Sequence, residues 1–208
     1  MLKARIAVLV SGGGTNLQAL IDAQKSGSLH DGRIELVLAS KKDAYALTRA
    51  GENGIEARAV CRRDFESQEA YEQEMARLID ERQIDLIILA GFMSILSGAF
   101  TSRYQGRIIN VHPSLIPSFC GKGYYGLKVH EAALSYGVKV TGATVHYVNE
   151  VTDGGRIILQ KAVEVQEGDT PKTLQRRVME EAEWQLLPKA AQMICAEIVK
   201  DRQTGRKI

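Results

Sequence analysis

The sequence predicts an α/β protein whose central sheet is mostly parallel, with about seven strands and with helices on both faces. Two observations predict this class. Short apolar runs alternate along the chain with segments of helical periodicity. The first run, residues 6–10, is apolar throughout, which is typical of a central strand covered on both faces. Such alternation implies parallel strands joined by right-handed crossovers.

The first half of the chain continues this alternation. After the opening strand, Leu17, Leu20 and Ile21 recur at helical spacing and predict a helix. A second strand is expected at residues 34–39 because that run is again mostly apolar.

The next four elements repeat the pattern. A helix is expected at residues 44–52, where the Asn-Gly pair that follows would stop it. Residues 55–60 predict a third, more mixed strand. Residues 67–82 carry apolar side chains on one helical face, and residues 85–90 predict the fourth strand.

The second half adds three strands. Residues 96–104 predict a short helix, and residues 107–111 predict the fifth strand. Beyond a loop, residues 127–136 are helical in pattern, and two further strands are expected at residues 142–148 and 157–165.

A long closing helix is expected to begin at Pro171, with Thr170 or Asp169 as its N-cap. The 208 residues lie near the size of one domain with a substantial core. We therefore expect a single domain over residues 1–208.

Composition argues against several classes of function. Lys and Arg total 27 against 25 for Asp and Glu, so nothing favours a nucleic-acid or membrane surface. The first apolar run is too short for a signal peptide, and no run is long enough to span a membrane. The three cysteines, Cys61, Cys120 and Cys195, show no disulfide or metal-ligand spacing. We expect a cytoplasmic protein with reduced thiols and no metal.

Polar residues end the fifth predicted strand. Pro113 and Pro117 prevent the strand from continuing, so Asn110 and His112 should lie at its carboxyl end, where open α/β sheets bind ligands. Two residues apart, their side chains project to the same face. An amide beside an imidazole suits a carbonyl oxygen that gains negative charge. The alternative is that His112 is a hydrogen-bonded structural residue.

A glycine-rich loop, residues 11–16, separates the first strand from the first helix. Its backbone N–H groups and the helix N-terminus suit a phosphate. Leu17 stands where a dinucleotide fingerprint needs a glycine, and no Lys follows the last glycine as in a Walker loop. The pattern therefore favours a smaller phosphorylated ligand over NAD or ATP. The alternative is a tight turn without a ligand.

Asp153 precedes two glycines and has two interpretations. An Asp before Gly-Gly is most often a turn former. Alternatively, Asp153 lies beside His112 and favours the charged imidazole, which could stabilise an oxyanion and donate a proton to a leaving nitrogen. His146, on an alternating strand, is expected to position other groups rather than to act as the acid. His30 and His130 are expected on the surface.

Four distinct motifs follow one another along the chain. Residues 11–17 read Ser-Gly-Gly-Gly-Thr-Asn-Leu, and residues 89–96 read Leu-Ala-Gly-Phe-Met-Ser-Ile-Leu. Residues 110–117 read Asn-Val-His-Pro-Ser-Leu-Ile-Pro, and residues 153–160 contain Asp-Gly-Gly and then Ile-Leu-Gln. Together they resemble the phosphoribosylglycinamide formyltransferase family. The resemblance implies a Rossmann-like formyltransferase fold.

The same resemblance implies direct transfer of a formyl group from 10-formyltetrahydrofolate to the amine of glycinamide ribonucleotide in purine synthesis, without a metal. By position, Asn110, His112 and Asp153 would be catalytic. The phosphate would be held by Gly14, Thr15 and Asn16. The folate would be held by Met93, Ser94, Ile95, Leu96, Asn110, Asn149, Glu150, Val151, Thr152 and Asp153.

Some positions depart from the family pattern. Gln68 stands where many members carry an Arg that contacts the folate tail. Glu183 would meet the glycinamide substrate only after a one-residue shift of the alignment. The loop at residues 118–126 differs from the Pro-Gly version of many members, and its Lys122 either recognises an anion or is simply exposed. We assign no nucleophilic role to Cys120.

Other functions share parts of these motifs. Methionyl-tRNA formyltransferase and formyltetrahydrofolate hydrolase have a similar Asn-x-His-Pro-Ser-Leu-x-Pro core, but each is expected to carry an additional domain for which 208 residues leave no room. A non-catalytic nucleotide-binding sensor would not need Asn110, His112 and Asp153 together. We expect small-molecule partners and a monomer or homodimer.

Overall fold

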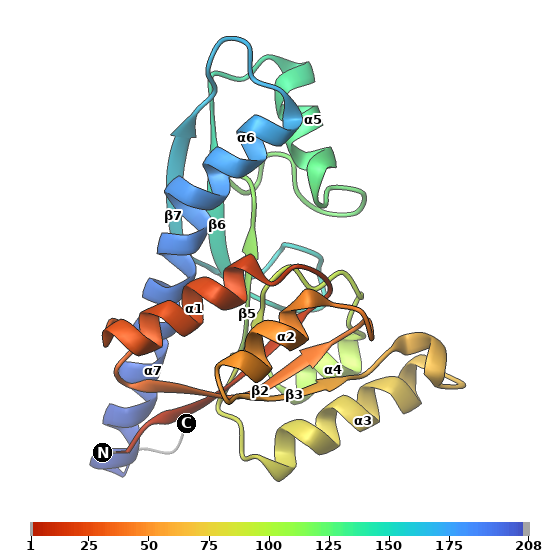
Figure 1. Ribbon diagram of the computed structural model, residues 1–208, viewed down its shortest axis with the longest axis vertical. Helices are drawn as coiled ribbons and strands as arrows, with labels where there is room; N and C mark the ends of the chain where they lie inside the picture. Colours follow the sequence, from red (N-terminus) through yellow and green to blue (C-terminus); the bar gives the residue numbers. More distant parts are fainter. Residues whose placement is uncertain (1, 206–208) are drawn as a thin grey trace.

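The computed structural model describes residues 2–205 and confirms the α/β class (Figure 1). The strands are β1 (Ala4–Val10), β2 (Gly32–Ala39), β3 (Glu56–Ala59), β4 (Leu86–Leu89), β5 (Ile108–His112), β6 (Val140–Tyr147) and β7 (Ile157–Glu164). Within the described residues these seven strands form one sheet in the order β3-β2-β1-β4-β5-β6-β7.

Helices fill the connections. They are α1 (Thr15–Ser26), α2 (Tyr45–Glu52), α3 (Gln68–Glu81), α4 (Gly98–Arg103), α5 (Leu127–Tyr136), α6 (Pro171–Val178) and α7 (Trp184–Thr204), with a short 3-10 helix η1 (Arg62–Asp64) and a π-helical segment η2 (Met179–Glu183). Strands β1 to β5 pair in parallel. The β5–β6 and β6–β7 pairs are antiparallel. The sheet is therefore mostly parallel, as predicted.

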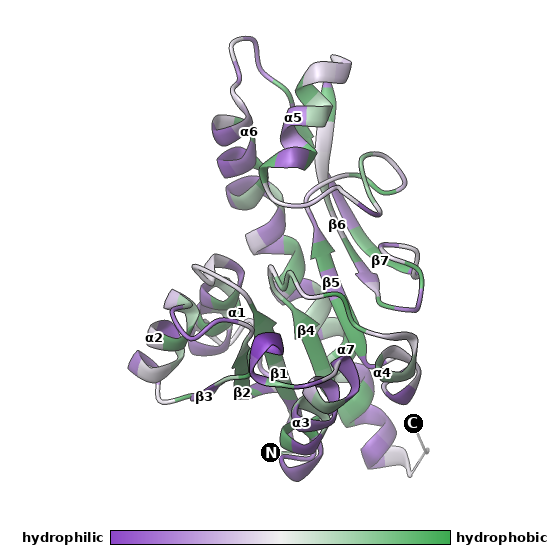
Figure 2. Ribbon diagram, turned by 90° about the vertical axis from the view of Figure 1, so that its right-hand side faces the viewer, coloured by the Kyte–Doolittle hydropathy of each residue, from purple (hydrophilic) through white to green (hydrophobic). Residues whose placement is uncertain are grey.

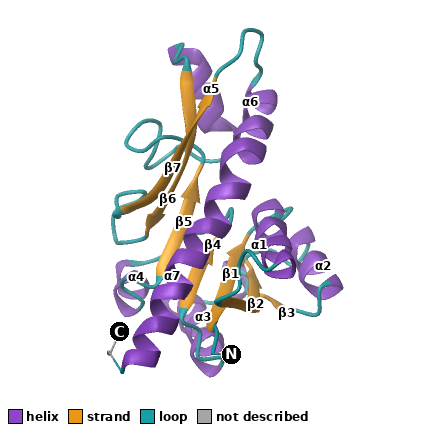
Figure 3. Cartoon of the chain, turned by 90° about the vertical axis from the view of Figure 1, so that its left-hand side faces the viewer, coloured by secondary structure: helices purple, strands orange, loops and turns teal. Residues whose placement is uncertain are grey.

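The two faces of the sheet carry separate hydrophobic cores. Ile6 and Val8 of β1 pack into one core with residues of α1 and α7. Ala7 and Leu9 pack into the other core, which includes Tyr71 of α3. Because side chains alternate along a strand, these cores lie on opposite faces. Figure 2 shows hydrophobic strands between the helices, and Figure 3 shows α7 running along one face of the sheet.

The predicted closing helix differs from the structure in one respect. Thr170 caps its start and Pro171 is the first helical residue, as predicted. The helix is not continuous, however, because η2 separates α6 from α7. A π-helical turn accommodates an extra residue without rotating the flanking helices. The periodicity of the sequence could not reveal it because both flanks are regular α-helix.

The surface prediction for His130 was wrong. His30 is exposed, with a side chain 66% accessible, but His130 is fully buried in α5. His130 lies three residues before Ala133, so both occupy the buried face of the helix. The charged neighbours Lys128 and Glu131 conceal this face in the sequence. Across residues 2–205, no helix has the length and apolar character to cross a membrane.

Candidate active site

The predicted site residues gather where parallel strands end. Leu89 of β4 pairs with Asn110 of β5, so the segment after β4 and the polar end of β5 lie side by side. Met93, in that segment, donates its backbone N–H to Ser11 Oγ in the loop after β1, at 2.8 Å. The carboxyl ends of β1, β4 and β5 therefore form one continuous edge, the usual ligand position in such sheets.

His112 and Asp153 meet at this edge. The two side chains are 6% and 9% accessible, and His112 Nδ1 lies 3.5 Å from Asp153 Oδ2. The other ring nitrogen, Nε2, lies 2.9 Å from the carbonyl oxygen of Phe119. Both nitrogens thus face acceptors, which suits a doubly protonated imidazolium. Gly121 N–H donates to Asp153 Oδ2 at 2.8 Å, so the loop after Pro117 covers the pair.

His146 orients Asn110. Burial lowers the pKa of His146, which favours the neutral ring. His146 Nδ1 lies 2.9 Å from the Tyr147 carbonyl oxygen and therefore carries the proton. Nε2 is then the acceptor for Asn110 Nδ2 at 3.2 Å, and it lies 3.7 Å from Asp153 Oδ1. The neutral His146 ring thus bonds the Asn110 carboxamide, and the positioning role expected for His146 stays a prediction.

A hydrogen-bond network holds the turn after β5. Thr144 Oγ1 donates to the Ser114 carbonyl at 2.7 Å and accepts from Ile116 N–H at 3.1 Å. Gln160 Nε2 donates to the Ile116 carbonyl at 3.0 Å. Sequence reasoning missed Thr144 and Gln160 as supports. The available signal was that Thr144 and His146 share one face of an alternating strand.

The glycine loop has a backbone that only glycine accommodates at one position. Gly14 has a φ of 71°, and a Cβ there would lie 2.7 Å from Ala46 Cβ. The carbonyls of Gly12 and Gly13 accept hydrogen bonds from Ala46 N–H and Arg49 Nε. The carbonyls are therefore directed at α2, while the first N–H groups of α1 are free of intrahelical acceptors.

Asn16 and Glu183 are brought together from opposite ends of the chain. Asn16 Nδ2 donates to Glu183 Oε2 at 2.6 Å, and both side chains are buried. Burial raises the pKa of the Glu183 carboxyl to about 7, against the opposing effect of the Asn16 hydrogen bond. Asn16 Oδ1 is buried and has no hydrogen-bond partner among residues 2–205. The segment η2 thus places a carboxyl directly against the second residue of α1.

The segments predicted to hold folate are exposed and adjacent. Met93 and Ile95 are 55% and 77% accessible, and Val151 is 59% accessible. A Cβ on Gly98 would lie 3.9 Å from Glu150 Cβ, so residues 93–98 and 149–153 come together. Three exposed apolar side chains at one polar edge form a surface suited to a flat organic ligand.

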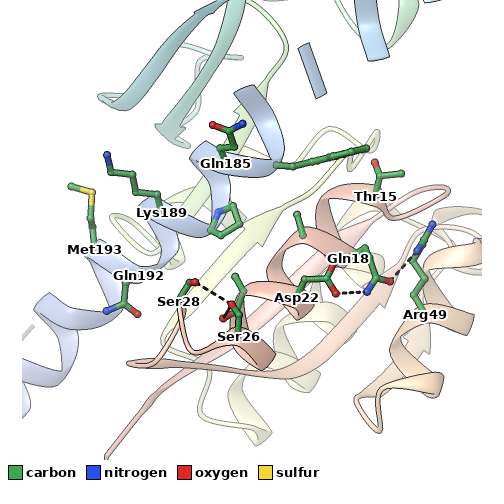
Figure 4. A pocket seen from close by; sticks show the side chains of 14 residues that line it. Thr15, Gln18, Asp22, Ser26, Ser28, Arg49, Gln185, Lys189, Gln192 and Met193 are labelled. Carbon is green, nitrogen blue, oxygen red and sulfur yellow. Dashed lines mark hydrogen bonds between the residues drawn. The ribbon is translucent and has the colours of Figure 1, made fainter. Parts of the chain in front are cut away.

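A hollow of about 830 Å³ lies between α1 and α7, lined by Thr15 and Trp184 but not by His112 or Asp153 (Figure 4). It adjoins the glycine loop rather than the polar edge. Among residues 2–205, no group of three or more His, Cys, Asp or Glu side chains is arranged to hold a metal.

Cys120 lies beside this edge without the character of a nucleophile. Burial and the nearby Asp153 carboxylate raise the pKa of its thiol, and Sγ donates to the Pro117 carbonyl. A protonated thiol is a poor nucleophile. Lys122, in the same loop, is exposed.

Residues 4–191 match the family described as formyl transferase. This chain belongs to the formyl transferase family. The resemblance found in the sequence is thereby confirmed.

Relatives of this formyl transferase carry consistent names. The phosphoribosylglycinamide formyltransferase of Escherichia coli (strain K12) is 44% identical over 173 residues, which is 83% of this chain and 79% of the relative. The human trifunctional purine biosynthetic protein adenosine-3 is 41% identical over 204 residues, or 98% of this chain and 20% of the relative. This formyl transferase therefore spans about a fifth of the length of its trifunctional relatives.

A solved structure agrees in fold. The glycinamide ribonucleotide transformylase 1 of Symbiobacterium toebii matches with a TM-score of 0.87 and 39% identity, covering 94% of this chain and 89% of that chain. The Rossmann-like formyltransferase fold predicted for this formyl transferase is thereby confirmed.

Proposed function

We propose that this formyl transferase moves the formyl group of 10-formyltetrahydrofolate to the amine of glycinamide ribonucleotide, in de novo purine synthesis. The names of its relatives support the acceptor and the pathway. The observation that carries the proposal is the convergence of Asn110, His112 and Asp153 at one strand edge, with His112 Nδ1 3.5 Å from Asp153 Oδ2.

The proposed reaction is a direct transfer. The uncharged amine attacks the formyl carbon and the carbonyl oxygen becomes an oxyanion. The amine nitrogen then releases one proton through a water held by Asp153, and the bond from the formyl carbon to the folate nitrogen breaks as that nitrogen receives a proton from His112. Asn110 Nδ2 and His112 Nε2 stabilise the oxyanion as preorganised donors. His112 Nε2 now donates to the Phe119 carbonyl at 2.9 Å, so the formyl oxygen takes over that hydrogen bond when the donor binds.

Asp153 keeps His112 charged and oriented. Its carboxylate faces Nδ1, and the imidazolium it favours can also supply the proton for the leaving nitrogen. His146 acts through Asn110, by fixing the carboxamide so that its second N–H stays available. Much of the remaining acceleration comes from holding two substrates in register.

The substrates occupy neighbouring parts of the edge. Gly14, Thr15 and Asn16 bind the phosphate, and Glu183, hydrogen-bonded to Asn16, contacts the glycinamide substrate. The folate binds between residues 93–96 and 149–153, beside Asn110 of β5. Its contacts are Met93, Ser94, Ile95, Leu96, Asn110, Asn149, Glu150, Val151, Thr152 and Asp153. The donor is a co-substrate, and the proposed chemistry needs no metal. A cytoplasmic location and a monomeric or homodimeric state remain predictions.

The test follows the loss of 10-formyltetrahydrofolate by absorbance, with and without glycinamide ribonucleotide. Loss that requires the acceptor supports the transferase. Loss that is equally fast without the acceptor identifies a formyltetrahydrofolate hydrolase instead, and no loss in either mixture supports the non-catalytic sensor.

A further inference from the structure

We propose that Arg62 binds the anionic tail of the formyl donor and that Gln68 holds its guanidinium in place. This inference rests on the proposed function, because a folate donor ends in a p-aminobenzoyl group joined to glutamate. It assigns the carboxylate end of that donor to a residue outside the segments already described.

Arg62 is a half-buried cation without a carboxylate partner. It lies in η1, where Nε donates to Gln68 Oε1 at 3.1 Å and Nη1 donates to the Phe65 carbonyl at 2.8 Å. Both acceptors are neutral, and no Asp or Glu oxygen of residues 2–205 lies within 4.0 Å. The adjacent Arg63 does lie 4.0 Å from Asp64. The remaining N–H donors of Arg62 are therefore available to an anion.

Gln68 connects Arg62 to the proposed folate site. Its Nε2 donates to the Ile95 carbonyl at 3.1 Å, while its Oε1 accepts from Arg62. One carboxamide thus spans from the cation to the backbone of the segment that carries exposed Met93 and Ile95. Gln68 itself is neutral and cannot replace a cation, so it acts as a positioning residue.

The Glu72 carboxylate, which also bonds Gln68, makes no ion pair with Arg62. Glu72 accepts from Gln68 Nε2 at 2.7 Å, from Ser97 N–H at 2.7 Å and from Ser97 Oγ. It is 6% accessible and turned toward α4, so it does not neutralise Arg62. This arrangement leaves a fixed positive charge at the end of an exposed apolar surface. A ligand with an apolar aromatic body and a terminal carboxylate matches both features.

The experiment compares two donors that differ only in the tail. Steady-state kinetics are measured with 10-formyltetrahydrofolate and with 10-formyltetrahydropteroate, which lacks the glutamate. Arg62→Gln should raise KM for the first donor on the order of 10-fold, with kcat unchanged, because a partly buried charged hydrogen bond is lost. KM for the second donor should not change. Gln68→Ala should shift KM in the same direction by a smaller factor.

Arg63→Gln is the matched control and should leave both KM values unaltered. If Arg62→Gln and the wild type have the same KM for the glutamylated donor, the inference is overturned, while the proposed function stays intact. An equal rise in KM for both donors also overturns it, since that pattern marks a general structural role. If the wild type transfers from neither donor, the proposed function fails together with the inference.

Discussion

At the scale of single residues, the contact between His112 and Asp153 governs the proposed chemistry. His112→Ala removes an oxyanion donor, and Asp153→Asn removes the charge that faces Nδ1. Each should lower kcat by roughly 10²-fold to 10³-fold, the usual effect of losing one such donor. Phosphate-substrate binding, measured by calorimetry, should persist. His30→Ala is the control because that ring is exposed, and near-normal turnover in both site variants would contradict the assignment.

Glu183 provides a second prediction at this scale. Burial raises the pKa of its carboxyl from 4.5 to about 7. Between these pH values the folded protein holds a proton that the unfolded chain releases. Stability that is fully present below pH 4.5 is therefore lost as pH rises toward 7. Over this interval the unfolding free energy of the wild type should fall by about 3 kcal/mol relative to Glu183→Gln, which does not titrate.

Urea unfolding of both proteins at a series of pH values measures this difference. Glu183→Gln keeps an oxygen that can accept from Asn16, so the comparison isolates the titration rather than the hydrogen bond. Parallel stability curves for the two proteins would show that Glu183 does not carry the shift.

At the scale of elements, the loop between β1 and α1 depends on Gly14. A Cβ at this position would lie 2.7 Å from Ala46 Cβ. The backbone there also has a φ of 71°, which L-residues rarely adopt. Gly14→Ala should lower the unfolding free energy by about 1 to 3 kcal/mol and weaken phosphate binding. Gly12→Ala is the matched control, because a Cβ at that position meets nothing within 4 Å. The unfolding free energy of this variant should stay near that of the wild type. Equal losses in both variants would refute the steric argument.

The π-helical segment η2 leads to another prediction. It holds one residue more than a regular helix needs, so deleting the exposed Glu181 should leave a continuous helix with α7 in its present register. Deleting the exposed Lys189 from α7 should instead rotate buried residues such as Ile194 out of the core, at a cost of several kcal/mol. Thermal unfolding of the two deletion variants separates these outcomes, and equal destabilisation would contradict the role of η2.

At the scale of the whole molecule, most elements were predictable from local patterns, whereas contacts between distant residues were not, apart from the proximity of His112 and Asp153. The strand at residues 6–10 and the helix at 127–136 followed from local apolar patterns, and the order of motifs indicated the family. The Asn16–Glu183 hydrogen bond joins residues 167 positions apart, and no local pattern encodes it. The Phe119 carbonyl lies only seven positions from His112, but its place at Nε2 depends on the path of the loop after Pro117, which no periodic pattern specifies. Burial of His130 was missed because charged neighbours flank it.

The reversal of strand direction after β5 has a consequence for biosynthesis. Asn110 and His112 come from the parallel part of the sheet, whereas Asp153 lies in the connection between β6 and β7, which pair antiparallel. On the ribosome, Asn110 and His112 leave the exit tunnel before Asp153, and α7, which packs against α1 and β1 in one core, leaves it after all three. The proposed site is therefore assembled late in synthesis, once α7 covers its face of the sheet.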